Sequence, residues 1–200
     1  LIYIFCYIYN ISLIYSELVM TSQIFAGVDE VGRGCLAGPV ISVAIILKKS
    51  IDRELMIDSK KLSVGKRIRL SRYILRHSRS IGVGICTNHE IDRINIHNAT
   101  LNSMKKAITN LDLSPKIAYI DGKFTPDLDI ECKSLIRGDA IMPEISAASI
   151  VAKVLRDNYM ISLDKILPVY GFRSNKGYGA KRHIDGIKTY GITEWHRKSF

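Results

Sequence analysis

The sequence predicts an α/β fold in which a mixed sheet is flanked by helices. Short apolar segments rich in Val and Ile alternate with longer segments whose apolar residues recur at helical spacing. The segment order indicates an antiparallel pair of strands at the start and at least one parallel crossover later. Residues 166–200 lack this alternation and are rich in Gly, Lys, Arg and Tyr, so we expect a small appended element there.

Each element follows from the distribution of apolar residues. Five short apolar segments predict strands: 24–29, 39–47, 80–87, 116–122 and 130–136. Ser63 can cap a helix over 64–77, because its hydroxyl can accept a bond from an N–H of the first turn. Residues 88–111 predict two helical pieces, and 142–161 predict the clearest helix. A solvated face is the simplest explanation of the basic residues in 64–77.

The chain is basic, with 29 Lys and Arg against 19 Asp and Glu and a formal net charge of +10. This surplus favours polyanionic partners, of which nucleic acid is the first candidate. Residues 166–200 contain seven basic and two acidic residues, so half of the surplus lies in the expected C-terminal element. We therefore expect a main domain over 20–165 and a basic element over 166–200 that contacts a polyanion.

Residues 1–19 differ from the rest because they are apolar and aromatic and contain no Lys or Arg. A secretory signal begins with basic residues, and a membrane span tolerates few interruptions such as the Asn, Ser and Glu found here. We expect an upstream extension, with the functional protein beginning at Met20; a weak membrane anchor is the alternative. The four widely spaced cysteines favour reduced thiols and a cytoplasmic location.

Acidic residues stand where the expected strands end. Asp29 and Glu30 follow the first strand, Asp121 ends another, and Asp139 lies between a short strand and the long helix. Strand ends and adjoining loops form the crevice in which α/β proteins carry out chemistry. Carboxylates that meet there repel one another unless a cation lies between them, and Mg²⁺ accepts such oxygen ligands. Two such ions can activate a water and stabilise a leaving oxygen at phosphorus.

The adjacent pair Asp29 and Glu30 imposes a geometric condition, because neighbours on a regular strand point to opposite faces. Both side chains can reach one metal only if the strand ends or bulges between them, which the glycines that follow would allow. The backbone carbonyl of Glu30 is another candidate ligand. Each acid alone could equally be a turn cap or half of a buried ion pair. Several acids at such junctions beside a glycine loop favour the metal site.

Several motifs resemble those of the ribonuclease HII family, the prokaryotic type 2 ribonucleases H. AGVDEVGRGCLAGPV is similar to the opening signature, DSKKLS to the second motif, and YIDG carries the third acid. GD and the following SAASIVAKVLRD resemble the fourth acid and its helix, and VYGFRSNKGYGAKRH and GITEWHRKSF resemble the closing segment. The motifs stand in the family's order over about residues 24–200. The resemblance implies an RNase H-like fold with a small C-terminal helical element.

The resemblance implies a metal-dependent endonuclease that uses Mg²⁺ or Mn²⁺. It would hydrolyse the RNA strand of RNA/DNA hybrids and nick 5′ of single ribonucleotides embedded in duplex DNA, leaving 5′-phosphate and 3′-hydroxyl ends. It would remove misincorporated ribonucleotides and RNA primers. We expect a cytoplasmic monomer without a membrane partner, with a catalytic domain over 20–165 and a substrate-binding element over 166–200.

The motif positions carry roles over to individual residues. The metal-binding and catalytic acids would be Asp29, Glu30, Asp121 and Asp139. The loop that reads the 2′-hydroxyl would be Gly32, Arg33 and Gly34, since glycines let the backbone approach a sugar edge and this hydroxyl distinguishes RNA from DNA. Tyr178 would pack on the adjoining deoxyribose. Phosphate contacts would come from Lys60 and Lys61, and support from Ser149, Lys153 and Asp157. Cys35 stands where the family pattern has Pro.

Other residues receive structural interpretations. We expect Tyr170 and Phe172 to be packing residues, and His183 and His196 to be ordinary surface histidines. The chief alternatives are a nucleic-acid-binding module without catalysis and a related nuclease of the same fold with another substrate. A nucleotide-binding loop is less favoured, because the glycine-rich segment lacks the Lys–Ser/Thr of a P-loop. The plain binding module would leave the junction acids unexplained, and it would keep its function after Asp29→Asn.

Overall fold

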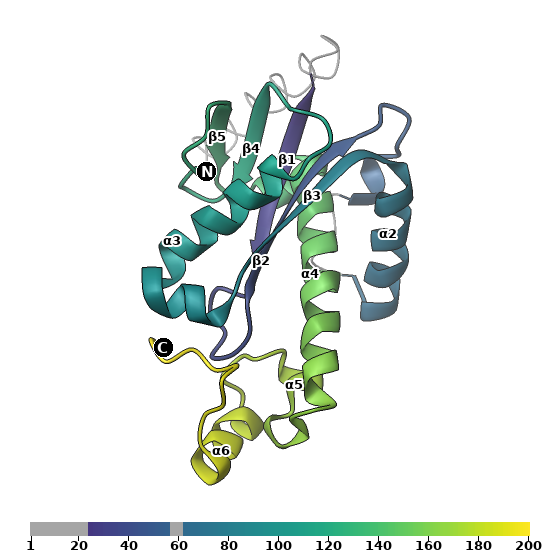
Figure 1. Ribbon diagram of the computed structural model, residues 1–200. Coiled ribbons are helices and arrows are strands. Elements are labelled where there is room, and N and C mark those ends of the chain that lie inside the picture. The colour runs from purple at the N-terminus through teal and green to yellow at the C-terminus, as the bar shows by residue number, and fades with distance from the viewer. Residues whose placement is uncertain (1–23, 57–61) are drawn as a thin grey trace, which may run out of the picture.

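The computed structural model describes residues 24–56 and 62–200. Its centre is a five-stranded sheet in the order β3-β2-β1-β4-β5 (Figure 1). The strands are β1 (Phe25–Val31), β2 (Val40–Leu47), β3 (Ser78–Cys86), β4 (Ile117–Asp121) and β5 (Glu131–Leu135). β1, β2 and β3 pair antiparallel, whereas β1–β4 and β4–β5 are parallel. The predicted mixed sheet with an antiparallel start is confirmed.

Helices cover both faces of this sheet. The α-helices are α2 (Val64–His77), α3 (Asn88–Thr109), α4 (Pro143–Asp164), α5 (Phe172–Asn175) and α6 (Lys181–Tyr190), and the 3-10 turns are η1 (Glu54–Met56), η3 (Gly138–Ala140) and η4 (Pro168–Tyr170). α3 packs on one face, where Met104 and Ala107 contact Val28 and Ala44. α2 and α4 pack on the other face (Figure 1). No helix among the described residues is both long and apolar enough to cross a membrane.

Local signals in the sequence account for several boundaries. Ser63 caps α2 as predicted, accepting a bond from the Lys66 N–H at 3.4 Å. Residues 88–111 were expected as two helical pieces, and α3 indeed contains a kink at Asn95, whose φ and ψ are 64° and 166°. The expected extension over residues 1–19 and the phosphate-binding pair Lys60 and Lys61 lie outside the described residues.

A glycine in β1 lets α4 lie directly on the sheet. A Cβ built on Gly27 would fall 2.2 Å from the backbone carbon of Glu144 in the first turn of α4. Any side chain here would push the helix away. This close approach holds α4 over the end of β1, where the predicted acids lie.

The C-terminal element folds back onto the loop that follows β1. The Arg197 N–H donates to the Leu36 carbonyl at 2.8 Å, and the Gly38 N–H donates to the Trp195 carbonyl at 2.9 Å. Tyr170 and Phe172 are buried in the small core between this element and α4, which confirms their packing role. The element is therefore joined to the main domain by backbone pairing as well as by side chains.

Candidate active site

Asp29, two residues before the end of β1, and Asp121, the last residue of β4, lie side by side on neighbouring parallel strands. The β1–β4 register pairs Val28 with Ile120, so the two acids follow at the next position of each strand. Val28 and Ile120 pack against α3, and side chains alternate along a strand. Asp29 and Asp121 therefore share the opposite face, the one covered by α4. The parallel pairing brings together two carboxylates that are 92 positions apart in the sequence.

The environment of Asp29 opposes its negative charge. The side chain is only 6% exposed, and this burial raises the pKa of Asp29 well above its usual range. The charges of Glu30 and Asp121 raise the pKa further, while hydrogen bonds from Ser149 and from the Glu30 N–H, at 2.7 Å, act in the other direction. Ser149 thus lies against the acid that it was predicted to support. A cation bound here would offset this repulsion.

Glu30 occupies a different position from the one expected. The β1–β2 ladder runs regularly through Asp29, Glu30 and Val31, so the strand neither ends nor bulges between the two acids. The expectation that the strand ends at Asp29 was wrong, because ladder pairing with β2 extends it by two residues. Glu30 therefore points to the other face and pairs with Arg33 at 3.6 Å. Burial raises the pKa of Glu30, Arg33 lowers it, and Asp121 raises it, so Glu30 and Asp121 still interact.

Asp139 lies in η3, immediately before α4, and is 5% exposed. The N–H of its neighbour Gly138 donates to Asp121 Oδ1 at 2.7 Å, which ties this turn to the end of β4. In residues 24–56 and 62–200, no three Asp, Glu, His or Cys side chains form a ready-made metal-binding group. The acids therefore share one end of the sheet without forming a closed cage. Mg²⁺ suits such an open set because it keeps several of its waters.

Two buried arginines that the sequence reasoning missed hold the glycine-rich loop after β1. Arg156 of α4 donates to the carbonyls of Ala37, Pro39 and Lys176. Arg197 of the tail donates to the carbonyls of Gly32, Arg33 and Gly38. The burial of Arg156 could have been inferred from the sequence, because Arg156 lies four residues after Ala152 on an otherwise apolar helix face.

The same contacts explain the glycine that opens the loop. Gly32 has a φ of 97°, and a Cβ there would lie 2.2 Å from Arg156 Nε. Gly34 faces open space, and Arg33 is exposed. The loop is thus fixed from the inside by Arg156 and Arg197, while its outer side stays accessible.

Tyr178 lies on the segment that links α5 to α6, and its side chain is 42% exposed. Burial raises the pKa of the Tyr178 hydroxyl, and contact with Cys35 of the glycine-rich loop adds to this. Arg156 also binds the Lys176 carbonyl at 2.7 Å, two residues before the tyrosine. One guanidinium therefore connects the loop to the segment that carries Tyr178.

The predicted supporting pair on α4 is present as an ion pair. Lys153 Nζ lies 2.8 Å from Asp157 Oδ1, one helical turn away. The lysine charge is thus directed along its own helix toward Asp157. Of the three residues predicted to support the site, Ser149 is the one that contacts a predicted metal ligand.

His183 and His196 were expected on the surface, and that expectation was wrong. They are 0% and 1% exposed, because the tail folds over Tyr170 and Phe172. Their Nε2 atoms are 3.1 Å apart. The Thr193 N–H donates to Nδ1 of His196, and Nδ1 of His183 contacts the Tyr178 carbonyl. Neutral rings satisfy every one of these contacts if His196 donates through Nε2 and His183 through Nδ1.

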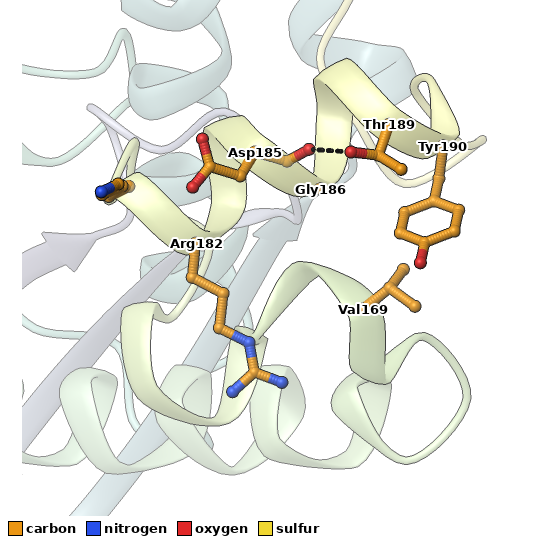
Figure 2. Close-up of a pocket in the computed structure, with 7 residues that line it drawn as sticks. Val169, Arg182, Asp185, Gly186, Thr189 and Tyr190 are labelled. Atoms are coloured by element: carbon orange, nitrogen blue, oxygen red, sulfur yellow. Dashed lines mark hydrogen bonds between the residues drawn. The ribbon is translucent and has the colours of Figure 1, made fainter.

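The C-terminal element also contains a hollow of about 490 Å³ (Figure 2). It is lined by Val169, Lys181, Arg182, Asp185, Gly186, Thr189 and Tyr190. Arg182 is anchored there by a bond to the Pro168 carbonyl at 3.1 Å. None of the residues predicted for the site lines this hollow, so it is separate from the carboxylates.

Comparisons with known proteins agree with this geometry. A family model described as Ribonuclease HII matches residues 26–200. A ribonuclease HII of Dichelobacter nodosus is 47% identical over 175 residues, which cover 88% of this chain and 93% of that protein. The Pelagibacter ubique ribonuclease HII is 48% identical over 179 residues, covering 89% and 96%. The crystal structure of the ribonuclease H2 from Pyrococcus horikoshii has a TM-score of 0.76 at 24% identity, covering 89% and 94%. The chain therefore belongs to the ribonuclease HII family, whose enzymes hydrolyse the RNA strand of RNA/DNA hybrids.

Proposed function

We propose that this ribonuclease H also nicks duplex DNA on the 5′ side of a single embedded ribonucleotide, leaving 5′-phosphate and 3′-hydroxyl ends. One observation carries the proposal: Asp29 of β1, which is buried, and Asp121 of β4 lie at the same end of the sheet as a glycine-rich loop whose carbonyls Arg156 and Arg197 bind. A rigid loop next to the carboxylates can test one sugar at the point of cleavage. The removal of misincorporated ribonucleotides and of RNA primers in the cytoplasm follows as its role, with the chain acting as a monomer.

A divalent metal is the cofactor that the acids fit. Asp29, Asp121 and Asp139 supply hard oxygen ligands, and Glu30, whose side chain points to the other face of the sheet, adds its backbone carbonyl. Burial raises the pKa of Asp29, and a cation bound beside the carboxylate would lower it again. When bound, Mg²⁺ or Mn²⁺ activates water and stabilises the leaving oxygen. A ribonuclease HIII of the same fold, 20% identical, was solved in complex with Mn²⁺, which is a property of that protein.

The residues of the chain have distinct parts in this function. Gly32 and Gly34 let the backbone of the loop approach the 2′-hydroxyl, and Arg33 lies on its exposed side. Tyr178 offers a half-exposed flat ring against the neighbouring deoxyribose. Lys60, Lys61 and the basic element over 166–200 hold phosphates without reading sequence. Ser149 keeps Asp29 in place through its hydrogen bond.

The test is a panel of three labelled duplexes of equal length: one with a single ribonucleotide, one RNA/DNA hybrid and one all-DNA control. The full chain is incubated with each duplex in Mg²⁺, and the product ends are mapped. We expect a nick 5′ of the single ribonucleotide, with a 3′-hydroxyl on the upstream fragment. Cleavage of the hybrid without any nick at the single ribonucleotide would instead favour a related nuclease that needs longer RNA tracts.

A further inference from the structure

Helix α2 carries a stripe of positive charge that the proposed function does not use. Residues 62–79 contain six basic residues and no acidic one, whereas 166–200 contain seven basic and two acidic. These two segments carry +6 and +5, and the rest of the chain carries −1, which gives the net charge of +10. The remaining chain is nearly neutral, so α2 is one of two segments toward which a polyanion is attracted.

The charges of α2 lie on one ridge of the helix. Arg69, Arg72 and Arg76 are spaced three and four residues apart, which places them on the same face. All three are exposed, and the ridge lies opposite Ile74, which is fully buried against α4. Lys66, also exposed, extends the ridge by one turn toward the start of the helix.

Neighbouring elements continue the same charge. The β2–β3 ladder pairs Leu47 with Ser78, which brings exposed Lys48 beside the end of α2. Arg79 is exposed one residue after that pair. Positive charge therefore runs from the first turn of α2 to the edge of the sheet.

This arrangement destabilises the free protein. Like charges three or four positions apart on a helix repel each other, and a cation in the first turn, such as Lys66, opposes the helix dipole. Within the described part of the chain, no carboxylate lies within ion-pair distance of Arg69, Arg72 or Arg76. Surface helices usually relieve such repulsion with interspersed acids, and α2 has none. A bound polyanion would relieve it instead.

The first turn of α2 lies next to the segment that carries Tyr178, through the face of the helix that is turned toward α4. A hollow of about 70 Å³ is lined by Val64 and Arg67 of α2, by Asp157 of α4 and by Lys176. Lys176 is the residue whose carbonyl Arg156 binds, two positions before Tyr178. From this point α2 runs for 14 residues, a length of about 21 Å. That length matches about six base pairs of duplex.

We propose that the α2 stripe, defined as Lys66, Arg69, Arg72 and Arg76, binds the phosphate backbone of the substrate duplex outside the catalytic site. It serves as a second anchor that is independent of sequence and acts only on duplexes long enough to reach it. The proposal rests on the proposed function, because the bound polyanion is the duplex whose ribonucleotide lies at the acids. The first turn of α2 lies near Lys176, two residues before Tyr178, and this proximity favours a duplex bound at the acids over a membrane surface.

The test compares R69Q/R72Q/R76Q with wild type and with K105Q/K116Q/K123Q. The control removes the same charge from exposed lysines on α3 and on the loops flanking β4. Fluorescence anisotropy in EDTA measures the affinity for 12- and 30-base-pair duplexes between about 50 and 200 mM salt. The stripe variant lacks three phosphate contacts, so its affinity should depend less steeply on salt. Between about 50 and 200 mM salt, the affinity of wild type for the 30-base-pair duplex should therefore fall about 40-fold more than that of the stripe variant. The control variant should behave as wild type, and the difference between wild type and the stripe variant should be smaller on the 12-base-pair duplex, which has fewer phosphates beyond the catalytic site.

Equal salt slopes for wild type and the stripe variant on the 30-base-pair duplex would overturn the proposal. Binding of wild type to phosphatidylglycerol vesicles that the duplex does not compete away would also overturn it and assign the stripe to an anionic membrane. Nicking is assayed separately on the same proteins. A wild type that never nicks a single ribonucleotide but shows the stripe-dependent salt slope refutes the proposed function alone. Melting temperatures within a few degrees of wild type confirm that each variant is folded.

Discussion

The guanidinium of Arg197 donates a hydrogen bond to the carbonyl of Gly32 at 2.6 Å, although 165 positions separate the two residues. It also reaches the carbonyl of Arg33 at 2.8 Å. Burial lowers the pKa of Arg197 only to about 10, so the group keeps its charge at neutral pH. The tail of the chain therefore sets the conformation of the loop that is proposed to read the 2′-hydroxyl.

Arg197→Lys tests this link between the tail and substrate choice. Lysine keeps the charge but lacks the planar fork, so it cannot hold several carbonyls at once. We expect kcat/KM at a single ribonucleotide to fall by about 10- to 100-fold, and cleavage of a long hybrid to fall much less. Lys105→Gln, at an exposed position on α3 outside the proposed binding element, is the control and should leave both rates unchanged. Equal losses on the two substrates would show that Arg197 serves stability alone.

Tyr178→Ala tests the proposed contact with the deoxyribose. The ring is 42% exposed, so its removal should change the free energy of unfolding by roughly 0.5 kcal/mol or less. Nicking at a single ribonucleotide should fall by about tenfold, the effect of losing about 1.4 kcal/mol of packing in the transition state. Tyr190→Ala, at a 64% exposed position on α6, is the control. Unchanged nicking by the Tyr178 variant would remove this residue from the site.

The buried histidine pair predicts loss of stability in mild acid. Burial lowers the pKa of His196 to about 4, and the nearby His183 contributes. As pH falls below about 6.5, the unfolded chain therefore binds a proton before the folded protein does. The stability present above pH 6.5 should decrease progressively down to about pH 4. Urea unfolding of wild type and His196→Gln between pH 7.5 and 4.5 measures this, and the variant should show the flatter dependence. Parallel curves for the two proteins would contradict the prediction.

Asp29→Asn should stabilise the protein in EDTA while it abolishes cleavage. Burial raises the pKa of Asp29, so the folded protein keeps this carboxyl protonated to a higher pH than the unfolded chain does. The stability that this proton provides is full at low pH and is lost as pH rises through the raised pKa. Asparagine removes the loss, so the melting temperature should rise at pH 8 by about 2–4 °C for each kcal/mol regained. The gain should vanish near pH 4. A variant that melts below wild type at pH 8 would show that the carboxylate stabilises the free protein.

Much of the fold could be predicted because its signals are local. The apolar strands, the Ser63 cap and the two pieces of α3 each follow from a few adjacent residues. The end of β1 was missed because pairing with β2 carries the strand through Glu30 despite its charge. The burial of His183, His196 and Arg197 depends on the tail folding back across the loop after β1, a contact between distant segments. No local pattern of polar residues indicates such burial.

The acids were predictable for a different reason. The sequence shows to within about two residues where an apolar strand ends, and parallel neighbours place their ends together, so Asp29 and Asp121 could be expected at one site. The face on which each acid lies depends on strand register, which the sequence does not show. For this reason, only the observed pairing of β1 with β2 shows that Glu30 points to the face of the sheet opposite Asp29.

The measurement that tests the central claim most directly is cleavage by wild type and by Asp121→Asn of a duplex with one ribonucleotide. Each is assayed in Mg²⁺, in Mn²⁺ and in EDTA, with circular dichroism to confirm folding. We expect a single nick 5′ of the ribonucleotide by wild type in either metal, none in EDTA, and a loss of at least about 10³-fold in the variant. A nick that persists in EDTA, or an Asp121→Asn variant as active as wild type, would contradict a metal-dependent site built on these acids.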